Sequence, residues 1–217
     1  MRPSGFLSLM RFDPAGLPFI GGALLLAVVS GAAVAWVLAI PFVALGAFFA
    51  FFFRDPERAC PDTADVVLSP ADGRVLVAGP AVPDAAPPGS WLQISIFLSP
   101  MDVHINRIPA SGRVTKVSYT PGRFLPAYRH DAASANERSE IWIDHDGQAI
   151  VARQIVGILA RRVVCRVQSG AEVRAGDRYG IMKFGSRMDI FLPTTATLKV
   201  QVGQAVRGGE TVIAVLN

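Results

Sequence analysis

A Gly-Ser pair near the C-terminus, Gly185-Ser186, brings together residue types that can react with each other. The pair lies in the stretch MKFGSRMD (182–189), between two apolar runs. It places a hydroxyl beside the carbonyl of a residue without a side chain, and glycine tolerates strained backbone geometry. The Ser186 hydroxyl could therefore attack the Gly185 carbonyl. Gly-Ser pairs also form ordinary turns, so this interpretation depends on the rest of the chain.

His104 and Asp72 supply the other residue types that such a reaction needs. A serine hydroxyl becomes a nucleophile when a base lies within hydrogen-bond reach and a third group holds that base in the right tautomer. His104 lies in LSPMDVHINRIP, and Asp72 lies in LSPADGRV. Asp72 also fits a simple Asp-Gly turn, and an isolated histidine is commonly structural. The sequence offers a candidate for each role without showing that they meet.

Metal and nucleic-acid sites are not expected. The three histidines (104, 130 and 145) and the two cysteines (60 and 165) lack the spacing of a metal site or of a disulfide framework. We therefore expect reduced cysteines in a domain that faces the cytoplasm. The net charge of +4 favours an anionic lipid surface. The basic residues are too few and too dispersed to indicate nucleic acid.

Residues 1–54 are predicted to anchor the chain in a membrane. The uncharged run from Pro14 to Phe53 is far longer than the roughly 20 apolar residues that one span needs. Pro41 is expected to break this run, because proline removes a helical hydrogen bond. Arginines lie on both sides of the run, at positions 2, 11, 54 and 58. By the positive-inside rule both flanks are cytoplasmic, which favours a hairpin or a re-entrant anchor over a single crossing.

Residues 55–217 are predicted to form a β-rich domain. Short β-branched runs alternate with Gly, Pro and Asp turns from Val66 onward, and one short helix is expected near 127–138. The segments 167–182 and 200–216 share the frame V-x-x-G-x-x-V-x-x-G. They predict two similar hairpins of one barrel-like sandwich, an architecture typical of biotinyl and lipoyl carrier domains.

Two alternatives to catalysis follow from these features. Lys183, after Ile181-Met182, looks like the modified lysine of a biotinyl or lipoyl carrier domain. Against this, Phe184 replaces the usual methionine, Gly-Ser-Arg follows at once, and a carrier needs no membrane anchor. A non-catalytic, membrane-anchored β-domain is the other alternative.

Five motifs in collinear order resemble the phosphatidylserine decarboxylase proenzymes, specifically the short bacterial or archaeal type. They are FFRDPER, SPADGRV, FLSPMDVHINRIP, the triplet Asn136-Glu137-Arg138, and KFGSRMDIFLP. The resemblance extends from about Phe52 to the end of the chain. It implies a lyase of phospholipid biosynthesis that converts phosphatidylserine to phosphatidylethanolamine and carbon dioxide.

The resemblance also implies how this chain would mature. Asp72 would orient His104, and His104 would take the proton from Ser186. The chain would then split into residues 1–185, the β chain, and 186–217, the α chain. Ser186 would become a pyruvoyl group, with no metal involved. The two chains would remain a heterodimer at the cytoplasmic face of the cell (inner) membrane, and the sequence leaves further dimerisation open.

The chain departs from the family pattern at Arg107. Many members carry Asp-x-His-x-x-His, and Arg107 occupies the second histidine position, so His104 would have to serve both cleavage and decarboxylation. Gly-Ser-Arg also replaces the Gly-Ser-Thr or Gly-Ser-Ser of other branches, but the scissile pair is intact. Candidates for binding the substrate's phosphate or carboxylate are Arg107, Arg123, Arg138, Lys183 and Arg187. Each of these also fits a solvated surface charge.

Overall fold

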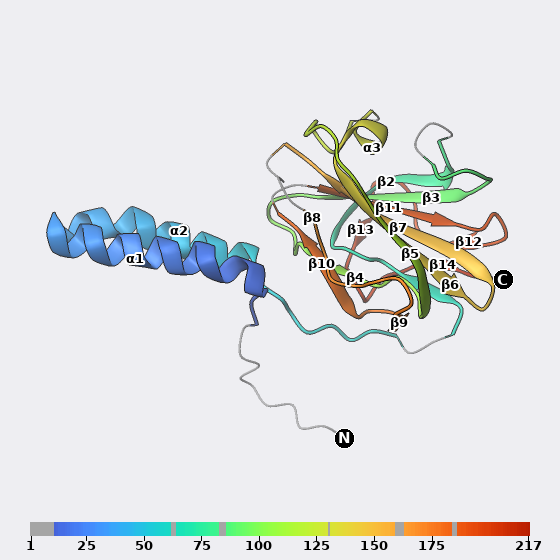
Figure 1. Ribbon diagram of the computed structural model, residues 1–217, viewed down its shortest axis with the longest axis horizontal. Coiled ribbons are helices and arrows are strands. Elements are labelled where there is room, and N and C mark those ends of the chain that lie inside the picture. Colours follow the sequence, from blue (N-terminus) through green and yellow to red (C-terminus); the bar gives the residue numbers. More distant parts are fainter. Residues whose placement is uncertain (1–10, 62–63, 83–85, 130, 159–162, 184–185) are drawn as a thin grey trace, which may run out of the picture. The chain divides into compact units, whose positions relative to one another are not determined.

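The computed structural model describes residues 11–61, 64–82, 86–129, 131–158, 163–183 and 186–217 (Figure 1). The chain divides into two compact units, Met1–Glu57 and Arg58–Asn217. The sequence predicted a boundary between residues 54 and 55.

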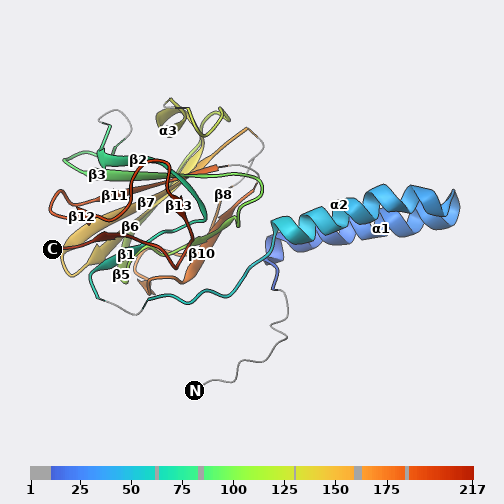
Figure 2. The ribbon, with the colours of Figure 1, turned by 180° about the vertical axis from the view of Figure 1, so that it is seen from behind.

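The first unit is a pair of helices. The 3-10 helix η1 (Pro14–Gly16) leads into α1 (Leu17–Ala33), and η2 (Trp36–Leu38) leads into α2 (Ala39–Phe52). The two long helices run side by side (Figure 2). Small residues allow this close packing: Ala23 and Ala27 are buried, and a Cβ on Gly46 would lie 3.4 Å from Leu24 Cδ2. Residues Pro14–Ala33 are long and apolar enough to cross a membrane. A helical hairpin is one of the two arrangements that the sequence favoured.

The break in the apolar run lies at Val34–Ala35, so the prediction that Pro41 breaks it was wrong. Both Val34 N and Ala35 N donate to Ser30 O, at 3.1 and 3.2 Å, which ends α1. Pro41 lies in the first turn of α2. Backbone N–H groups in a first helical turn have no intrahelical acceptor, so proline is tolerated there.

The second unit consists of antiparallel sheets, which confirms the predicted β-rich fold. The large sheet has the order β13 (Ala205–Val206), β2 (Gly73–Pro80), β3 (Leu92–Leu98), β11 (Ser186–Leu192), β7 (Gln148–Val156), β6 (Arg138–His145), β5 (Gly112–Thr120), β9 (Glu172–Val173). A second sheet contains β4 (Ile105–Arg107), β10 (Arg178–Met182) and β8 (Val163–Cys165). A third contains β1 (Val66–Leu68), β14 (Val212–Val215) and β12 (Thr197–Leu198). Within the described part of this unit, the one α-helix is the short α3 (Ala132–Ala135).

Strand β11 lies inside the large sheet, between β3 and β7. Its register pairs Ser186 with Leu98 on one side and with Val156 on the other. Side chains alternate along a strand. Met188 and Ile190 therefore enter the apolar core, and Arg187 lies on the opposite face of the sheet. All seven residues of β11 are buried, so the position that follows Gly185 in the chain is deep inside the unit.

The internal repeat is a repeat of glycine turns. Equivalent glycines share a left-handed conformation, with φ of 91° and 88° at Gly170 and Gly203, and of 86° and 78° at Gly176 and Gly209. The strands around them pair elsewhere: β9 with β5, β10 with β4 and β8, β13 with β2, and β14 with β1 and β12. The predicted hairpins were therefore wrong. Glycine fixes the local turn, whereas strand pairing depends on distant segments.

Candidate active site

Ser186 is the first residue of β11 and is fully buried. Its Oγ has no hydrogen-bond partner among the residues that the structure describes. Leaving a buried hydroxyl unpaired costs about 1–3 kcal/mol, so such groups are uncommon in folded proteins. Gly185, the other half of the predicted cleavage site, lies outside the described residues, as does Phe184. Ser186 is thus a buried hydroxyl that no contact among the described residues explains.

His104 is buried directly before β4, and its ring orientation is set locally. Its Nδ1 lies 2.9 Å from the carbonyl oxygen of Asp102. A carbonyl can only accept a hydrogen bond, so Nδ1 must carry the proton. In the neutral ring Nε2 is then the basic nitrogen. His104 is therefore held in the tautomer that a general base requires.

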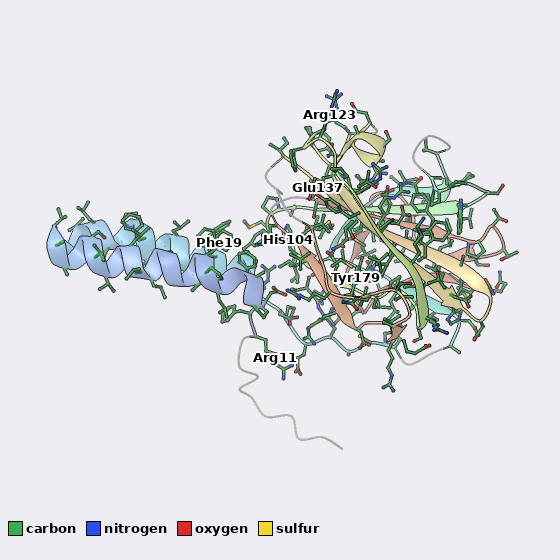
Figure 3. All side chains as sticks on the ribbon, in the orientation of Figure 1. Arg11, Phe19, His104, Arg123, Glu137 and Tyr179 are labelled. Atoms are coloured by element: carbon green, nitrogen blue, oxygen red, sulfur yellow. The ribbon has the colours of Figure 1, made fainter. Side chains whose placement is uncertain are left out.

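The strand pairing brings the His104 segment next to the chain that leads into Ser186. Met182 N, at the end of β10, donates to His104 O at 3.4 Å. Met182 is only four positions before Ser186 in the sequence. From the other side, Leu98 pairs with Ser186, and the turn Ser99–Asp102 connects Leu98 to His104. His104 is thus connected to the region of Ser186 in two ways, through the bond to Met182 and through the turn that follows Leu98. Figure 3 labels His104 within this unit.

Asp72 lies in a partly buried ion-pair cluster. Its Oδ2 is 2.7 Å from Arg58 Nη2, and its Oδ1 accepts from Gly208 N at 2.8 Å. Arg58 also reaches Glu210, at 3.3 Å. The described contacts of Asp72 are with Arg58 and Gly208, so its role in orienting His104 stays a prediction. The contact that holds the His104 ring comes from the Asp102 carbonyl.

Two amide side chains that the sequence analysis missed lie between the two sheets. Gln154 Nε2 on β7 donates to Asn106 Oδ1 on β4 at 2.8 Å, and both residues are buried. Asn106 Nδ2 and Gln154 Oε1 have no hydrogen-bond partner in the described part of the chain. The sequence carried one signal for Asn106, because it lies only two residues after His104. Gln154 was visible only as a polar residue inside the apolar run of β7.

The triplet Asn136-Glu137-Arg138 fixes the end of β7 next to Ser186. The Asn136 side chain bonds Leu125 N and O at 2.9 and 2.8 Å, and its Nδ2 also donates to Val156 O at 2.8 Å. Val156 N in turn donates to Glu137 O at 3.1 Å. Because Val156 is the cross-strand partner of Ser186, the triplet positions one wall of the candidate site.

The predicted substrate-binding cations occupy different environments. Arg107 is buried and donates to Gly176 O at 2.9 Å. Arg138 donates to Ser134 O at 2.7 Å, and burial, followed by the charge of Arg153, lowers its pKa. Lys183 directly follows β10. Roles for these three residues in substrate binding stay predictions.

Arg187 and Arg123 have structural contacts. Arg187 lies on the face of β11 opposite to Ser186 and forms a 2.6 Å ion pair with Asp189. Arg123 forms a backbone bridge with Asn136 and is labelled in Figure 3. Among the described residues, no cluster of three or more His, Cys, Asp or Glu side chains could hold a metal ion.

The chain is similar over most of its length to proteins of one family. The sequence profile of the family described as phosphatidylserine decarboxylase matches residues 45–214. A phosphatidylserine decarboxylase proenzyme of Desulfotalea psychrophila is 41% identical over 199 residues, which cover 91% of this chain and 93% of the relative. One from Granulibacter bethesdensis is 43% identical over 208 residues, covering 93% and 84%. One from Pelodictyon phaeoclathratiforme is 45% identical over 167 residues, covering 77% and 78%. Given matches of this length and identity, the chain belongs to the phosphatidylserine decarboxylase family.

Proposed function

We propose that the chain is a proenzyme that cleaves itself between Gly185 and Ser186 and then decarboxylates phosphatidylserine to phosphatidylethanolamine. The observation that carries the proposal is the buried Ser186 hydroxyl. It has no hydrogen-bond partner among the described residues, and it follows a segment bonded to the backbone of His104. Family membership supports the same reaction. Nothing comparable supports the carrier or the non-catalytic alternative.

Cleavage begins with a proton transfer between two of the chain's own residues. His104 Nε2 accepts the Ser186 hydroxyl proton as Oγ attacks the Gly185 carbonyl carbon. The peptide C–N bond breaks, an ester C–O bond forms, and the proton passes to the Ser186 nitrogen. Loss of the Ser186 α-proton then expels the Gly185 carboxylate. The resulting dehydroalanine tautomerises and is hydrolysed, with release of ammonia, so that a ketone stands where the amine was.

The residues around Ser186 fit the pyruvoyl group that this sequence of steps forms. In the pyruvoyl group a methyl replaces the unpartnered hydroxyl and a ketone replaces the amine, so no buried donor is added that would need an acceptor. When formed, the pyruvoyl group supplies an electron sink for decarboxylation. His104 then serves a second time as an acid, delivering a proton to the carbon that has lost carbon dioxide. Arg107 at the second histidine position supports this double use of His104.

The strand pairing supports a stable heterodimer after cleavage. Residues 186–217 would form the α chain, and they contribute β11, β12, β13 and β14. Strand β11 is hydrogen-bonded on both sides to β-chain strands, β3 and β7. The pairs β13–β2 and β14–β1 add two further connections. The two chains would therefore stay together without the peptide bond.

The N-terminal hairpin supports a location at the membrane that holds the lipid substrate. The exposed side chains of α1 and α2 are overwhelmingly apolar, and charged residues gather at the base of the hairpin. Here Arg11 pairs with Glu57 at 3.4 Å, and Arg54 lies 3.9 Å from the ring centroid of Phe51. With arginines on both flanks, the positive-inside rule places the second unit at the cytoplasmic face.

The test is a denaturing intact-mass spectrum of the purified protein beside Ser186→Ala, with Ser118→Ala as a matched control on β5. We expect two chains from the unsubstituted protein and from the control. The smaller chain should begin at residue 186 and carry a ketone in place of its amine. Ser186→Ala should stay whole and release no carbon dioxide from phosphatidylserine.

Two results would overturn the proposal. An unsplit protein with an adduct on Lys183 would establish the carrier alternative. An unsplit and unmodified protein would leave a non-catalytic β-domain, in which Ser186, His104 and Asp72 are structural.

A further inference from the structure

The amide pair Asn106–Gln154 keeps one unused donor and one unused acceptor in the protein interior. Their exposed fractions are 0% and 1%, and one hydrogen bond of 2.8 Å joins them. Asn106 Nδ2 and Gln154 Oε1 are unpaired among the described residues. A polar pair that served only to join the sheets would have both ends satisfied, since a partly satisfied buried network is unfavourable.

The chemical identity of the two unused atoms follows from their neighbours. Gln154 Nε2 also lies 3.4 Å from Val164 O. A backbone carbonyl can only accept, so this end of Gln154 is the NH₂ group and the other end is the carbonyl. Because Gln154 donates to Asn106 Oδ1, the free end of Asn106 is its NH₂ group. The pair therefore offers one neutral donor and one neutral acceptor.

The strand register places Gln154 on the same face as Ser186, and Asn106 lies close to His104 in the chain. On the large sheet, Gln154 pairs with Met188 and Val156 pairs with Ser186, so Gln154 and Ser186 share a face. On the second sheet, Asn106 is the middle residue of β4, and His104 lies two positions before it, directly outside the strand. The bond between Asn106 and Gln154 shows that the two sheets meet here.

Gly180 makes room for this meeting. It pairs with Asn106 in the second sheet, and a Cβ at this position would lie 2.7 Å from Gln154 Nε2. Real Cβ atoms do not approach a polar atom so closely without a shift of the neighbour. The absence of a side chain at Gly180 is thus what lets Gln154 reach across the two sheets.

We propose that Asn106 and Gln154 bind the zwitterionic serine head group of the lipid; this inference rests on the proposed function. Asn106 Nδ2 donates to the head-group carboxylate, and Gln154 Oε1 accepts from the head-group amine. One donor and one acceptor match an α-amino acid, which carries one group of each kind. The product head group lacks the carboxylate, so it keeps the Gln154 contact and loses the Asn106 contact. The pair would therefore favour substrate over product.

Neutral amides suit a carboxylate that is about to leave as carbon dioxide. An arginine would stabilise the charged carboxylate strongly in the ground state, and that stabilisation is lost as the charge moves away in the transition state. An amide donor orients the carboxylate at a smaller cost to the reaction.

The test measures head-group binding without turnover. The cleaved protein is treated with borohydride, which supplies hydride and reduces the ketone to an alcohol, and is then titrated calorimetrically with glycerophosphoserine or glycerophosphoethanolamine. Asn106→Asp keeps an acceptor for Gln154 and replaces the unused donor with a carboxylate oxygen, which repels the head-group carboxylate. Gln154→Met removes the unused acceptor. Gln148→Met, the same change at the other end of β7, is the matched control.

We expect the unsubstituted protein to bind the serine head group at least about tenfold more tightly than the ethanolamine head group, as one hydrogen bond to a charged group allows. Asn106→Asp should abolish that preference, and Gln154→Met should weaken both ligands. Gln148→Met should behave like the unsubstituted protein. In turnover assays the first two variants should raise KM more than they lower kcat.

Each contrary result has a distinct meaning. Equal binding of the two head groups by the unsubstituted protein would overturn the inference, whether or not any variant folds. Unchanged serine preference in a cleaved Asn106→Asp protein would also overturn it and would leave the pair as a water site. Variants that remain uncleaved beside a cleaved unsubstituted protein would assign the pair to folding or cleavage instead. If the unsubstituted protein itself stays uncleaved, the proposed function fails, and this inference fails with it.

Discussion

Two buried polar groups lie on opposite faces of strand β11, and they differ in whether their hydrogen bonds are complete. The outer-face group consists of Arg187, Asp189, Ser95 and Gln93. Arg187 donates to Asp189 at 2.6 Å and to Ser95 at 2.9 Å, and Gln93 donates to Ser95 at 3.0 Å and to Asp189 at 3.3 Å. The inner-face group consists of Ser186, Asn106 and Gln154. Within the described residues, each of these three side chains retains an unpaired atom.

The difference indicates which group is structural and which is functional. A fully satisfied buried network holds neighbouring strands in one arrangement, and here it joins β11 to β3. An unsatisfied buried atom costs about 1–3 kcal/mol, so three of them in one place need a purpose other than stability. Of the adjacent residues Ser186 and Arg187, Arg187 thus serves packing, and the chemical role of Ser186 stays a prediction. Substitutions in the inner-face group and in the outer-face group can each test this difference.

Replacing His104, the proposed base, should have the largest effect on the rate of cleavage. We expect His104→Gln to slow cleavage about 10²- to 10⁴-fold, the usual contribution of a general base, because glutamine cannot take the Ser186 proton. The measurement is the appearance of the 186–217 chain with time in denaturing gels or mass spectra. The free energy of unfolding should change far less than this rate.

Asp102→Asn is the control for that substitution. The His104 ring bonds the backbone carbonyl of residue 102, which the change leaves in place, and asparagine can still accept from Ser99 N as the Asp102 carboxylate does at 2.7 Å. Cleavage should slow less than about tenfold, well below the range for a general base. Equal effects from both variants would mean that the Asp102 carboxylate, rather than the His104 base, limits cleavage.

The sequence singled out Ser186 as a reactive serine and His104 as its base from local chemistry and motif order, and both roles stay predictions. It did not identify Gln154, whose partner Asn106 is 48 positions away in the chain. Alternation along a strand predicts which residues of that strand share a face. It does not predict which other sheet packs against that face. That information arises from packing between sheets, and only the three-dimensional structure contains it.

The same division separates the correct from the wrong fold predictions. Glycine turns at 170, 176, 203 and 209 follow from local backbone preference, and the structure has all four. The hairpins inferred from them depended on which strands pair, which is a non-local outcome. A short helix was expected near 127–138, and in the structure it spans only Ala132–Ala135. Here Asn136 adopts an extended backbone, and its side chain bonds the backbone of Leu125, which ends the helix.

Breaking the outer-face group should lower stability and leave the chemistry intact. Arg187→Leu leaves the Asp189 carboxylate buried without its ion pair, so we expect a loss of about 3–5 kcal/mol in the free energy of unfolding. The double variant Arg187→Leu/Asp189→Leu removes both charges and should recover most of that loss. Urea unfolding measures both. The double variant should still cleave, and its failure to do so while folded would place Arg187 in the reaction.

The smallest effect is expected at Tyr179, which tests whether every unpaired buried atom marks function. Its hydroxyl is unpaired in the described part of the chain, but it lies within the apolar core. Burial, with a smaller contribution from Cys165, raises the pKa of Tyr179 well above its ordinary value. The unfolded chain therefore loses this proton first as pH rises above about 10, and the folded state loses stability there.

Tyr179→Phe should flatten that decline, raise the free energy of unfolding by up to about 1 kcal/mol, and leave cleavage unchanged. Slower cleavage would instead add Tyr179 to the inner-face group, and the unpaired hydroxyl would then have the same explanation as that of Ser186.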